Sequence, residues 1–415
     1  MTETDLFETI RAHVCQCAYD LDLAPDVEAI LKMPMREYHF SIPVRMDDGR
    51  IRAFQAFRVQ YNDARGPTKG GIRFHPAETI ETIRGLAAIM TWKCALFGLP
   101  LGGAKGGVVC NPKEMSAGEV ERLSRAYVQA LYRHLGPERD IPAPDVYTTP
   151  EIMAWMMDEY SKIAGHTTFG AITGKPIAVG GSEGRLEATA RGGWYVIAEA
   201  ARDAGIDLKG ATVAVQGFGN VGANAALLAR TLAGARVVAV SDSRGGVLDR
   251  NGLDLPRLLA HKERTGSVVG FAGAETISNE ALLELDVDIL VPAALENAID
   301  ADNAGRVRAK VVAEFANGPV SNEADAILRE KGVVLIPDLL CNGGGVVVSY
   351  FEMVQNLNMD HWDAAAVDAR LQRMMTSTYR AVSETAGRRG FSLRQAAYTI
   401  AVRNVVEAMK ARGWV

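Results

Sequence analysis

The chain has 415 residues, a formal net charge of −5 at pH 7 and 23% charged residues, which is the composition of a folded globular protein. Its length predicts two domains, because one hydrophobic core rarely extends over so many residues. No basic block is present, which argues against a nucleic-acid partner, and no apolar run is long enough to span a membrane.

The cysteines and the first residues indicate a cytoplasmic protein. The five cysteines are scattered, odd in number and without a CxxC pair, so reduced thiols are expected. The acidic start of the chain, Met1–Asp5, lacks the basic and then apolar order of a signal peptide.

The N-terminal part of the chain predicts a mixture of helices and strands. Helical spacing of apolar residues marks three segments, 4–19, 25–32 and 78–97. Strands are expected in three others, 38–44, 51–59 and 108–110. Asp47-Asp48-Gly49 is a hairpin signal between the first two strands. Residues 66–76 contain so much glycine and proline that no regular element is expected there.

Signals for helix ends follow, as far as a cluster of glycines at Gly180, Gly181 and Gly184. Ser116 begins a capping box that opens a helix to about residue 135. Residues 140–146 are extended and stiffened by two prolines, and Thr149 caps a further helix. The glycine cluster is the expected boundary between the two domains.

A glycine-rich turn between two apolar segments is the most specific motif. An apolar run leads into Gly217-x-Gly219-x-x-Gly222, a helical pattern follows, and a second apolar run ends at Asp242. This order of strand, glycine turn, helix, strand and acid is typical of a dinucleotide-binding unit. The first glycine allows a tight turn, the second lets the backbone approach a pyrophosphate, and the third lets helix and strand pack closely. The phosphates are expected at the positive end of the helix.

The rest of the chain completes an α/β fold in two domains. Strands at 289–291, 311–313 and 333–336 alternate with helices, as in a doubly wound parallel sheet. Two long helices, 362–386 and 393–409, are expected to return to the first domain. We therefore predict an α/β substrate domain, 1–182 with 346–415, and a Rossmann-type, doubly wound dinucleotide-binding domain, 183–345.

Lysines in the first domain indicate a site for a small anion. Lys93 and Lys105 are the only charged residues between Gly85 and Pro112, so no acid close in sequence can pair with them. Lys105 and Lys69 are flanked by glycines, which let a ligand approach closely. A lysine in apolar surroundings loses solvation, so its pKa falls and it can act as a base near neutrality.

Asp145 ends the segment that two prolines stiffen, where a carboxylate would be held rigidly. Taken alone, a cap or turn role is the simpler interpretation of this residue. The histidines show no metal-ligand spacing such as HExxH, so no metal is expected.

The motifs in combination resemble those of the glutamate dehydrogenases of the Glu/Leu/Phe/Val dehydrogenase superfamily, over essentially the full length of the chain. In chain order they are Gly66-Pro-Thr-Lys69-Gly-Gly-Ile-Arg73, Met90-Thr-Trp-Lys93-Cys-Ala, Pro100-Leu-Gly-Gly-Ala-Lys105-Gly-Gly107, Pro142-Ala-Pro-Asp145-Val, Gly217-Phe-Gly-Asn220-Val-Gly222, Pro292-Ala-Ala-Leu-Glu-Asn297, Ala316-Asn317-Gly318 and Val348-Ser349-Tyr350.

The resemblance implies roles for individual residues. Lys105 is implied as the catalytic lysine that activates water, and Asp145 as the carboxylate that transfers protons. Lys93 is implied to hold the substrate α-carboxylate, and Lys69 and Ser349 to hold its side-chain carboxylate. The implied cofactor-binding residues are Thr189, Gly217, Phe218, Gly219, Asn220, Val221, Asp242, Ala294 and Asn317.

The implied reaction is the reversible NAD(P)-dependent oxidative deamination of L-glutamate to 2-oxoglutarate and ammonia. It would take place in a cleft between the domains that closes to exclude water, in a homohexamer assembled through the first domain. Lys69 favours a substrate with a second carboxylate, because opposite an apolar side chain it would be an uncompensated buried charge.

The preference for NAD or NADP depends on the residues that follow the second apolar run of the dinucleotide motif. Asp242 can accept hydrogen bonds from a ribose 2′-hydroxyl and would repel a 2′-phosphate, which favours NAD. Arg244 could pair with that phosphate, which leaves NADP as the alternative. Ala190, Cys341 and Gly343 depart from the residues usual in the family, and these departures bear on turnover and cofactor geometry.

Two other functions are compatible with parts of the sequence. Gly180-Gly-Ser182-Glu-Gly184 matches the GxSxG elbow of serine hydrolases, and acids and His261 or His361 follow it. That interpretation leaves the dinucleotide motif unexplained. The other alternative is a non-catalytic homologue that binds the cofactor, although both Lys105 and Asp145 are present.

Overall fold

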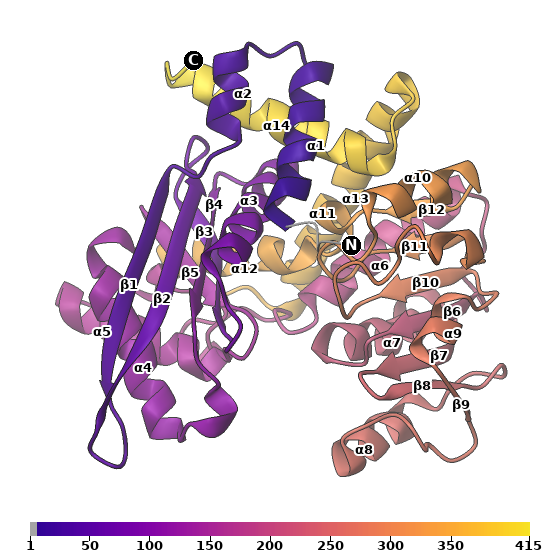
Figure 1. Ribbon diagram of the computed structural model, residues 1–415, viewed down its shortest axis with the longest axis horizontal. Helices are drawn as coiled ribbons and strands as arrows, with labels where there is room; N and C mark the ends of the chain where they lie inside the picture. The colour runs from indigo at the N-terminus through magenta and orange to yellow at the C-terminus, as the bar shows by residue number, and fades with distance from the viewer. Residues whose placement is uncertain (1–5) are drawn as a thin grey trace. The chain divides into compact units, whose positions relative to one another are not determined.

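The structure is a computed structural model that describes residues 6–415 and forms two compact units (Figure 1). Unit 1 comprises the described residues up to Arg185, together with Val346–Asp368 and Tyr398–Val415. Unit 2 comprises Leu186–Gly345 and Ala369–Ala397. Among the described residues, no helix is long and apolar enough to cross a membrane.

Unit 1 contains a mixed five-stranded sheet with the strand order β1-β2-β4-β3-β5. The strands are β1 (Arg36–Arg45), β2 (Ile51–Asn62), β3 (Thr68–Phe74), β4 (Gly102–Val108) and β5 (Asp140–Pro144). β1, β2 and β4 pair antiparallel, as the hairpin signal between β1 and β2 predicts, whereas β3 pairs parallel with both β4 and β5. The α/β class expected for this part of the chain is confirmed.

The glycine-rich stretches before Phe74 and before Val108 are strands, so the prediction of no regular element in 66–76 is wrong. Their glycines let helices approach both faces of the sheet. A Cβ atom on Gly103 would collide with the backbone of Thr91 in α3 (Ile80–Leu96), and one on Gly106 with the hydroxyl of Tyr127 in α4 (Ala117–Leu131). Close packing by two helices has here overridden the weak strand propensity of glycine.

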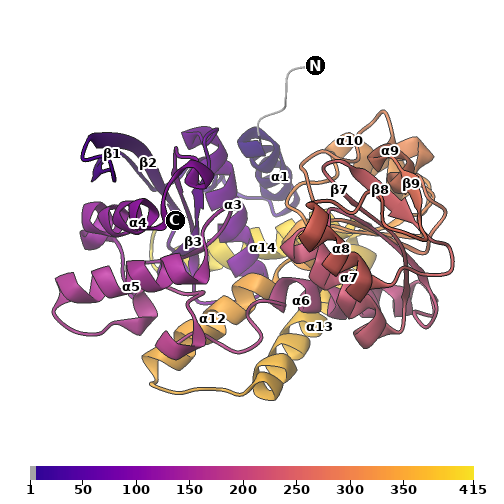
Figure 2. The ribbon, with the colours of Figure 1, turned by 90° about the horizontal axis from the view of Figure 1, so that it is seen from below.

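Helices cover the two faces of this sheet. α3 packs on the face that Gly103 presents, and α4 packs with α5 (Pro150–Ala164) on the other face, where a core cluster includes Ile72, Met153 and Met156. In Figure 2, α4 and α5 run side by side, which agrees with their contacts. The other helices that begin in unit 1 are α1 (Leu6–Asp20), α2 (Pro25–Leu31) and the first residues of α13 (Ala364–Arg389).

Unit 2 contains a seven-stranded sheet with the order β12-β11-β10-β6-β7-β8-β9. The strands are β6 (Thr212–Gln216), β7 (Arg236–Asp242), β8 (Gly245–Leu248), β9 (Glu275–Ile277), β10 (Ile289–Pro292), β11 (Val311–Ala313) and β12 (Val334–Ile336). The first five strands in this order pair parallel, and strand order reverses beside β6, which is the switch point of a doubly wound fold. The Rossmann-type sheet is therefore confirmed. The antiparallel edge strands β8 and β9 were not expected.

Helices alternate with the parallel strands of unit 2. They are α6 (Ala188–Asp203), α7 (Asn220–Ala233), α8 (Leu255–Thr265), α9 (Asn279–Leu283), α10 (Asn322–Glu330) and α11 (Asp338–Cys341). α12 (Gly344–Leu357) starts at the end of unit 2 and continues in unit 1.

The C-terminal helices are divided between the units, which differs from the expectation that all of 346–415 belongs with the first domain. From Ala369 onward α13 belongs to unit 2, where Tyr379 donates to Asp203 at 3.0 Å and Arg380 pairs with Glu199 at 3.1 Å. Both acids lie on α6. α14 (Leu393–Ala411) begins in unit 2 and belongs to unit 1 from Tyr398.

Candidate active site

Strand register places the predicted lysines of β3 and β4 on one face of the unit 1 sheet. Lys69 pairs with Gly103, and Arg73 with Gly107, across the parallel β3–β4 ladder. Because side chains alternate along a strand, Lys69, Arg73 and Lys105 all point to the face on which α3 packs. Lys93 lies in the last turn of α3 and is only 6% exposed.

Lys105 and Asp145 form an ion pair in which Nζ and Oδ2 are 2.6 Å apart. The lysine is buried, and the aspartate side chain is 24% exposed. A Cβ atom on Gly71 would lie 2.6 Å from the same carboxylate oxygen, so this glycine leaves room for the pair. Asp145 is fixed further because its backbone N–H donates to the Thr148 hydroxyl at 2.7 Å. The cap or turn role alone is therefore insufficient to describe Asp145.

The electrostatics of this pair favour the charged carboxylate. Burial by itself would raise the pKa of Asp145, but the Lys105 ammonium and the Arg73 guanidinium outweigh burial, and the net effect lowers this pKa. The Nε atom of Arg73 lies 3.7 Å from Asp145 Oδ1. A carboxylate and an amine in contact can pass a proton between them and a bound substrate.

Lys69 lies in a chain of hydrogen bonds with Thr173 and Ser349. Its Nζ donates to the Thr173 hydroxyl at 2.5 Å, and that hydroxyl is 2.7 Å from the hydroxyl of Ser349. Lys69 is 1% exposed, and burial lowers its pKa from 10.5 to about 7, although Glu352 partly opposes this effect. Lys69 and Ser349, which are expected to bind the same substrate carboxylate, are thus connected through Thr173.

Thr173 was not among the predicted site residues. Its segment, Gly170–Pro176, could be recognised in the sequence as glycine-rich, but its spacing fits no phosphate loop. Lys175 and Glu352 hold the segment in place, because their side chains are wholly buried and form an ion pair of 2.7 Å. Glu352 also accepts from the backbone N–H of Gly174 at 2.8 Å.

Arg185 is a second residue that the sequence did not single out. Its Nε atom is buried without a hydrogen-bond partner among the described residues. Burial lowers the pKa of Arg185, whereas Glu352 and Asp145 raise it, and Arg185 in turn lowers the pKa of Lys69. Arg185 therefore adds positive charge that acts on Lys69.

The glycine turn of unit 2 has the conformation that dinucleotide binding requires. Gly217 directly follows β6 with φ at +90°, which only glycine adopts easily, and a Cβ atom there would lie 2.8 Å from Ala294. No atom lies within 4 Å of the Cβ position of Gly219, so a ligand can approach the backbone there. A Cβ atom on Gly222 would collide with the carbonyl oxygen of Gly217, which explains the third glycine.

The turn leads directly into α7, whose first residues are Asn220 and Val221. The N-terminal N–H groups of this helix have no partners within the helix and carry positive potential, as a pyrophosphate requires. Phe218 is buried, and its carbonyl accepts from Lys262 Nζ at 2.5 Å, which fixes the turn. The residues of unit 2 therefore fit a dinucleotide.

Asp242 ends β7, the strand that pairs with β6. Its carboxylate accepts hydrogen bonds from the backbone N–H of Arg244 at 2.9 Å and of Val268 at 2.7 Å, and from the Ser267 hydroxyl at 3.1 Å. Asp242 thus organises the neighbouring loop, and Oδ2, which accepts only one of these bonds, retains capacity for another.

The remaining predicted cofactor residues also lie in unit 2. Thr189 lies in the first turn of α6, and Ala294 is exposed two residues after the end of β10. Asn317 accepts from the side chain of Asn342 at 3.0 Å. Of the departures from the family pattern, Cys341 and Ala190 are both almost fully buried, so they are packing positions.

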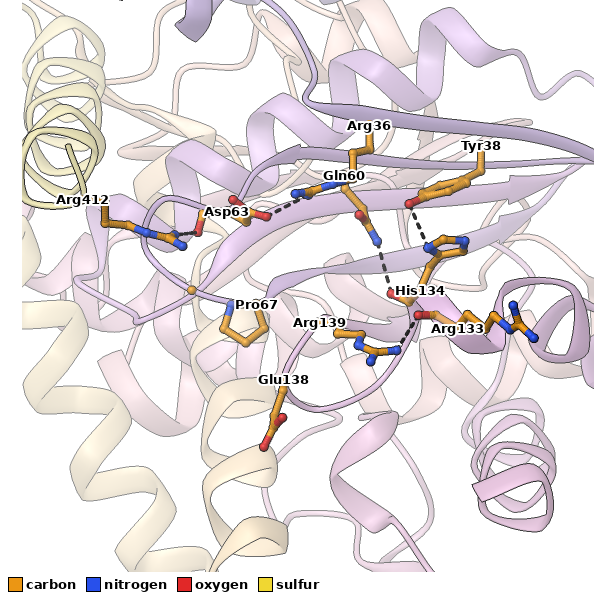
Figure 3. A pocket seen from close by; sticks show the side chains of 11 residues that line it. Arg36, Tyr38, Gln60, Asp63, Pro67, Arg133, His134, Glu138, Arg139 and Arg412 are labelled. Atoms are coloured by element: carbon orange, nitrogen blue, oxygen red, sulfur yellow. Dashed lines mark hydrogen bonds and ion pairs between the residues drawn. The ribbon is translucent and has the colours of Figure 1, made fainter. Parts of the chain in front are cut away.

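A cavity of about 430 Å³ in unit 1 shares no lining residue with the lysine site (Figure 3). Its polar groups pair with one another: Arg36 with Asp63 at 2.8 Å, Tyr38 with His134 at 3.1 Å, and Arg139 with the carbonyl of Arg133. These contacts connect the start of β1 with the segment after β2 and with His134.

The serine hydrolase alternative is wrong. Ser182 follows a 3₁₀ turn, Ile177–Val179, instead of the strand that a nucleophile elbow requires. The Ser182 hydroxyl donates to the carbonyl of Glu183 at 3.1 Å and accepts from Gln355 at 3.0 Å, so its partners are not histidines. No group of three or more metal-ligating side chains occurs within residues 6–415.

Two family profiles match the sequence. Residues 180–413 match "Glutamate/Leucine/Phenylalanine/Valine dehydrogenase", and residues 34–162 match the "dimerisation domain" of the same family. The chain is 50% identical over 414 residues to a glutamate dehydrogenase of Thermotoga maritima, with 100% of this chain and 99% of the relative covered. It is 47% identical to the NAD-specific glutamate dehydrogenase GudB of Bacillus subtilis, with coverage of 99% and 96%.

A solved structure has the same fold. The hetero-hexameric glutamate dehydrogenase of Thermus thermophilus, in a leucine-bound form, superposes with a TM-score of 0.95 at 42% identity and covers 100% of this chain and 98% of its own. The glycine turn, the paired lysine and aspartate, and matches over the full length lead to one assignment. The chain belongs to the Glu/Leu/Phe/Val dehydrogenase family.

Proposed function

We propose that this protein catalyses the reversible NAD-dependent oxidative deamination of L-glutamate to 2-oxoglutarate and ammonia. The observation that carries the proposal is the pair formed by Lys105 and Asp145, with the second buried lysine, Lys69, on the same face of the sheet. Relatives that share about half of the sequence over its full length are named glutamate dehydrogenases, and three of them are named NAD-specific. Their names support both the substrate and the cofactor.

In the proposed mechanism Lys93 holds the α-carboxylate of glutamate. Bound NAD supplies the hydride acceptor. Asp145 takes a proton from the substrate amine, which lets the α-carbon become an iminium carbon as hydride leaves. Lys105 activates the water that adds to this carbon, and Asp145 returns a proton to the departing ammonia. Because Lys105 Nζ and Asp145 Oδ2 are 2.6 Å apart, a proton can pass from one residue to the other between steps.

The side-chain carboxylate of glutamate is assigned to Lys69, Ser349 and Thr173. Lys69 is buried and near-neutral when no anion faces it, so a bound carboxylate would restore its charge. An apolar side chain would give no such compensation. This difference disfavours leucine and phenylalanine as substrates.

The cofactor residues are proposed to be Thr189, Gly217, Phe218, Gly219, Asn220, Val221, Asp242, Ala294 and Asn317. Support comes from the open backbone at Gly219, the start of α7 and the acid at the end of β7. Asp242 favours NAD, because its charge opposes a 2′-phosphate. NADP is the weaker alternative, through Arg244.

Initial rates test the substrate and the cofactor together. Purified protein is assayed with glutamate, leucine and phenylalanine, each with NAD and with NADP. We expect kcat/KM to be highest for glutamate with NAD, and Asp242→Ser to narrow the gap between NAD and NADP. Protein that binds NAD but forms no NADH from any amino acid would instead support a non-catalytic homologue.

We further propose that unit 1 carries both the substrate site and the oligomer contacts, and that the protein is a cytoplasmic homohexamer. The match of residues 34–162 to a dimerisation domain and the hexameric Thermus thermophilus enzyme support the assembly. The five free cysteines support the location. A light-scattering mass near that of one 44.6 kDa chain would contradict the hexamer.

A further inference from the structure

Glu78 is a buried acid close to the Lys105–Asp145 pair that the mechanism above does not use. It directly precedes Thr79, the residue that caps α3, and it is 6% exposed. A Cβ atom on Gly107 would lie 2.7 Å from its Cγ, so the glycine of β4 makes room for this side chain. Among the described residues, no side chain donates a hydrogen bond to either carboxylate oxygen.

Arg73 connects this acid to the proposed catalytic pair. Its Nε atom lies 3.4 Å from Glu78 Oε2 and 3.7 Å from Asp145 Oδ1, while Asp145 also contacts Lys105 at 2.6 Å. The four side chains therefore form a row of alternating charge: Lys105, Asp145, Arg73, Glu78. The row is neutral when all four groups are ionised, and Arg73 stands between two carboxylates.

The surroundings of Glu78 identify which charges act on it. Burial raises the pKa of Glu78 most strongly. Arg73, Lys105 and the backbone N–H of Thr79 lower this pKa, and Asp145 raises it. Arg73 lies in β3, Lys105 in β4, and Asp145 in the segment after β5. Asp145 also raises the pKa of Arg185, so a further positive charge interacts with this acid.

We propose that Glu78 is a positioning residue that sets the proton affinity of Asp145 by holding part of the charge of Arg73. With Glu78 ionised, Arg73 is shared between two acids, and Asp145 remains basic enough to accept a proton from the substrate amine. Without that charge, Arg73 and Lys105 would both stabilise the Asp145 carboxylate, which would become a weaker base. The inference rests on the proposed roles of Lys105 and Asp145.

The test is the pH profile of kcat/KM for glutamate oxidation in Glu78→Gln, which keeps the shape and removes the charge. Loss of a negative charge favours the deprotonated forms of the proton-accepting groups in the row. The acid limb should therefore move to lower pH by about one unit. The plateau of kcat should fall by about threefold to tenfold, because a weaker base accepts protons less readily. KM for NAD should stay unchanged.

Controls separate this effect from a structural one. Glu81→Gln removes an exposed glutamate in the first turn of α3, which pairs with Arg84 at 3.5 Å, and should leave the profile in place. Glu78→Asp restores the charge and should return the acid limb close to its wild-type position. If Glu78→Gln fails to fold, the same pH profile is measured with Glu78→Met, which also removes the charge.

The outcomes are distinct. An active wild-type enzyme with an unshifted acid limb in Glu78→Gln would overturn the inference, whatever the effect on thermal stability. A shift of equal size in Glu81→Gln or in Glu78→Asp would overturn it as well. A wild-type protein without glutamate turnover would instead refute the proposed function.

Discussion

At the scale of single residues, Lys69 shows how burial prepares a charged group for its ligand. The side chain lies among the strands and α3 at 1% exposure, and its partner is a hydroxyl group of Thr173. Burial costs the ammonium its hydration, so the pKa falls to about 7. The charged form of Lys69 is therefore unfavourable at this position unless an anion binds beside it.

The lowered pKa of Lys69 predicts that this lysine takes up a proton when a dicarboxylate binds. At pH 8 a lysine of pKa about 7 is mostly neutral, and a bound carboxylate raises its pKa so that it takes up a proton. At pH 6 Lys69 is already charged, so the uptake should vanish. Calorimetry of glutarate binding in buffers of different ionisation enthalpy measures the number of protons taken up. The Lys69→Met variant should show no such proton uptake. Equal uptake by wild type and variant would remove Lys69 from the site.

At the scale of elements, the two glycine-rich strands determine where the site forms. β3 and β4 carry few side chains, so α3 and α4 pack almost on the backbone. The few side chains that remain on the α3 face include Lys69, Arg73 and Lys105. Close packing excludes water around them, which strengthens every charge interaction in the site.

The packing predicts a severe effect of one methyl group. In Gly103→Ala the new Cβ atom meets the backbone of Thr91, which cannot rotate away as a side chain can. We expect a loss of about 3 kcal/mol or more, seen as a lower midpoint in thermal or denaturant unfolding.

Gly387→Ala is the matched control for this prediction. Gly387 lies in α13, is exposed and has no atom within 4 Å of its Cβ position, so alanine should stabilise the helix by about 0.5–1 kcal/mol. Similar midpoints for the two variants would contradict this account of the glycine strands.

At the scale of the whole molecule, the chemistry is divided between the two units. The proposed proton-transfer and substrate residues, Lys69, Lys93, Lys105, Asp145 and Ser349, all belong to unit 1. Every proposed cofactor residue belongs to unit 2, which has its own core cluster around Leu290 and Val312. A substitution in unit 1 can therefore abolish turnover while unit 2 still binds the cofactor.

Lys105→Ala tests this division. Turnover of glutamate should fall by about a thousandfold or more, because the base and its contact with Asp145 are lost. The Kd for NAD, measured by calorimetry, should change less than about twofold, a change worth under 0.5 kcal/mol. Substantial remaining turnover would show that Lys105 is not the proton-transfer lysine, and a large loss of NAD affinity would contradict the division.

Local patterns in the sequence predicted several parts of this protein correctly. The spacing of Gly217, Gly219 and Gly222 indicated the turn, and the structure places each glycine where its stated reason applies. The capping box at Ser116 and the N-cap at Thr149 are both formed. Such features depend on backbone geometry within a few residues, so a short stretch of sequence is sufficient to specify them.

Only the tertiary structure determined which distant residues meet. Thr173 joins Lys69 to Ser349 across more than a hundred positions of sequence on each side, and Glu78 reaches Asp145 through Arg73. The glycine stretches became strands because helices pack on both faces, and α13 belongs to unit 2 from Ala369 onward, where it contacts α6. Local propensity is weak at these positions, and the free energy gained by packing segments that are remote in the chain decides their conformation.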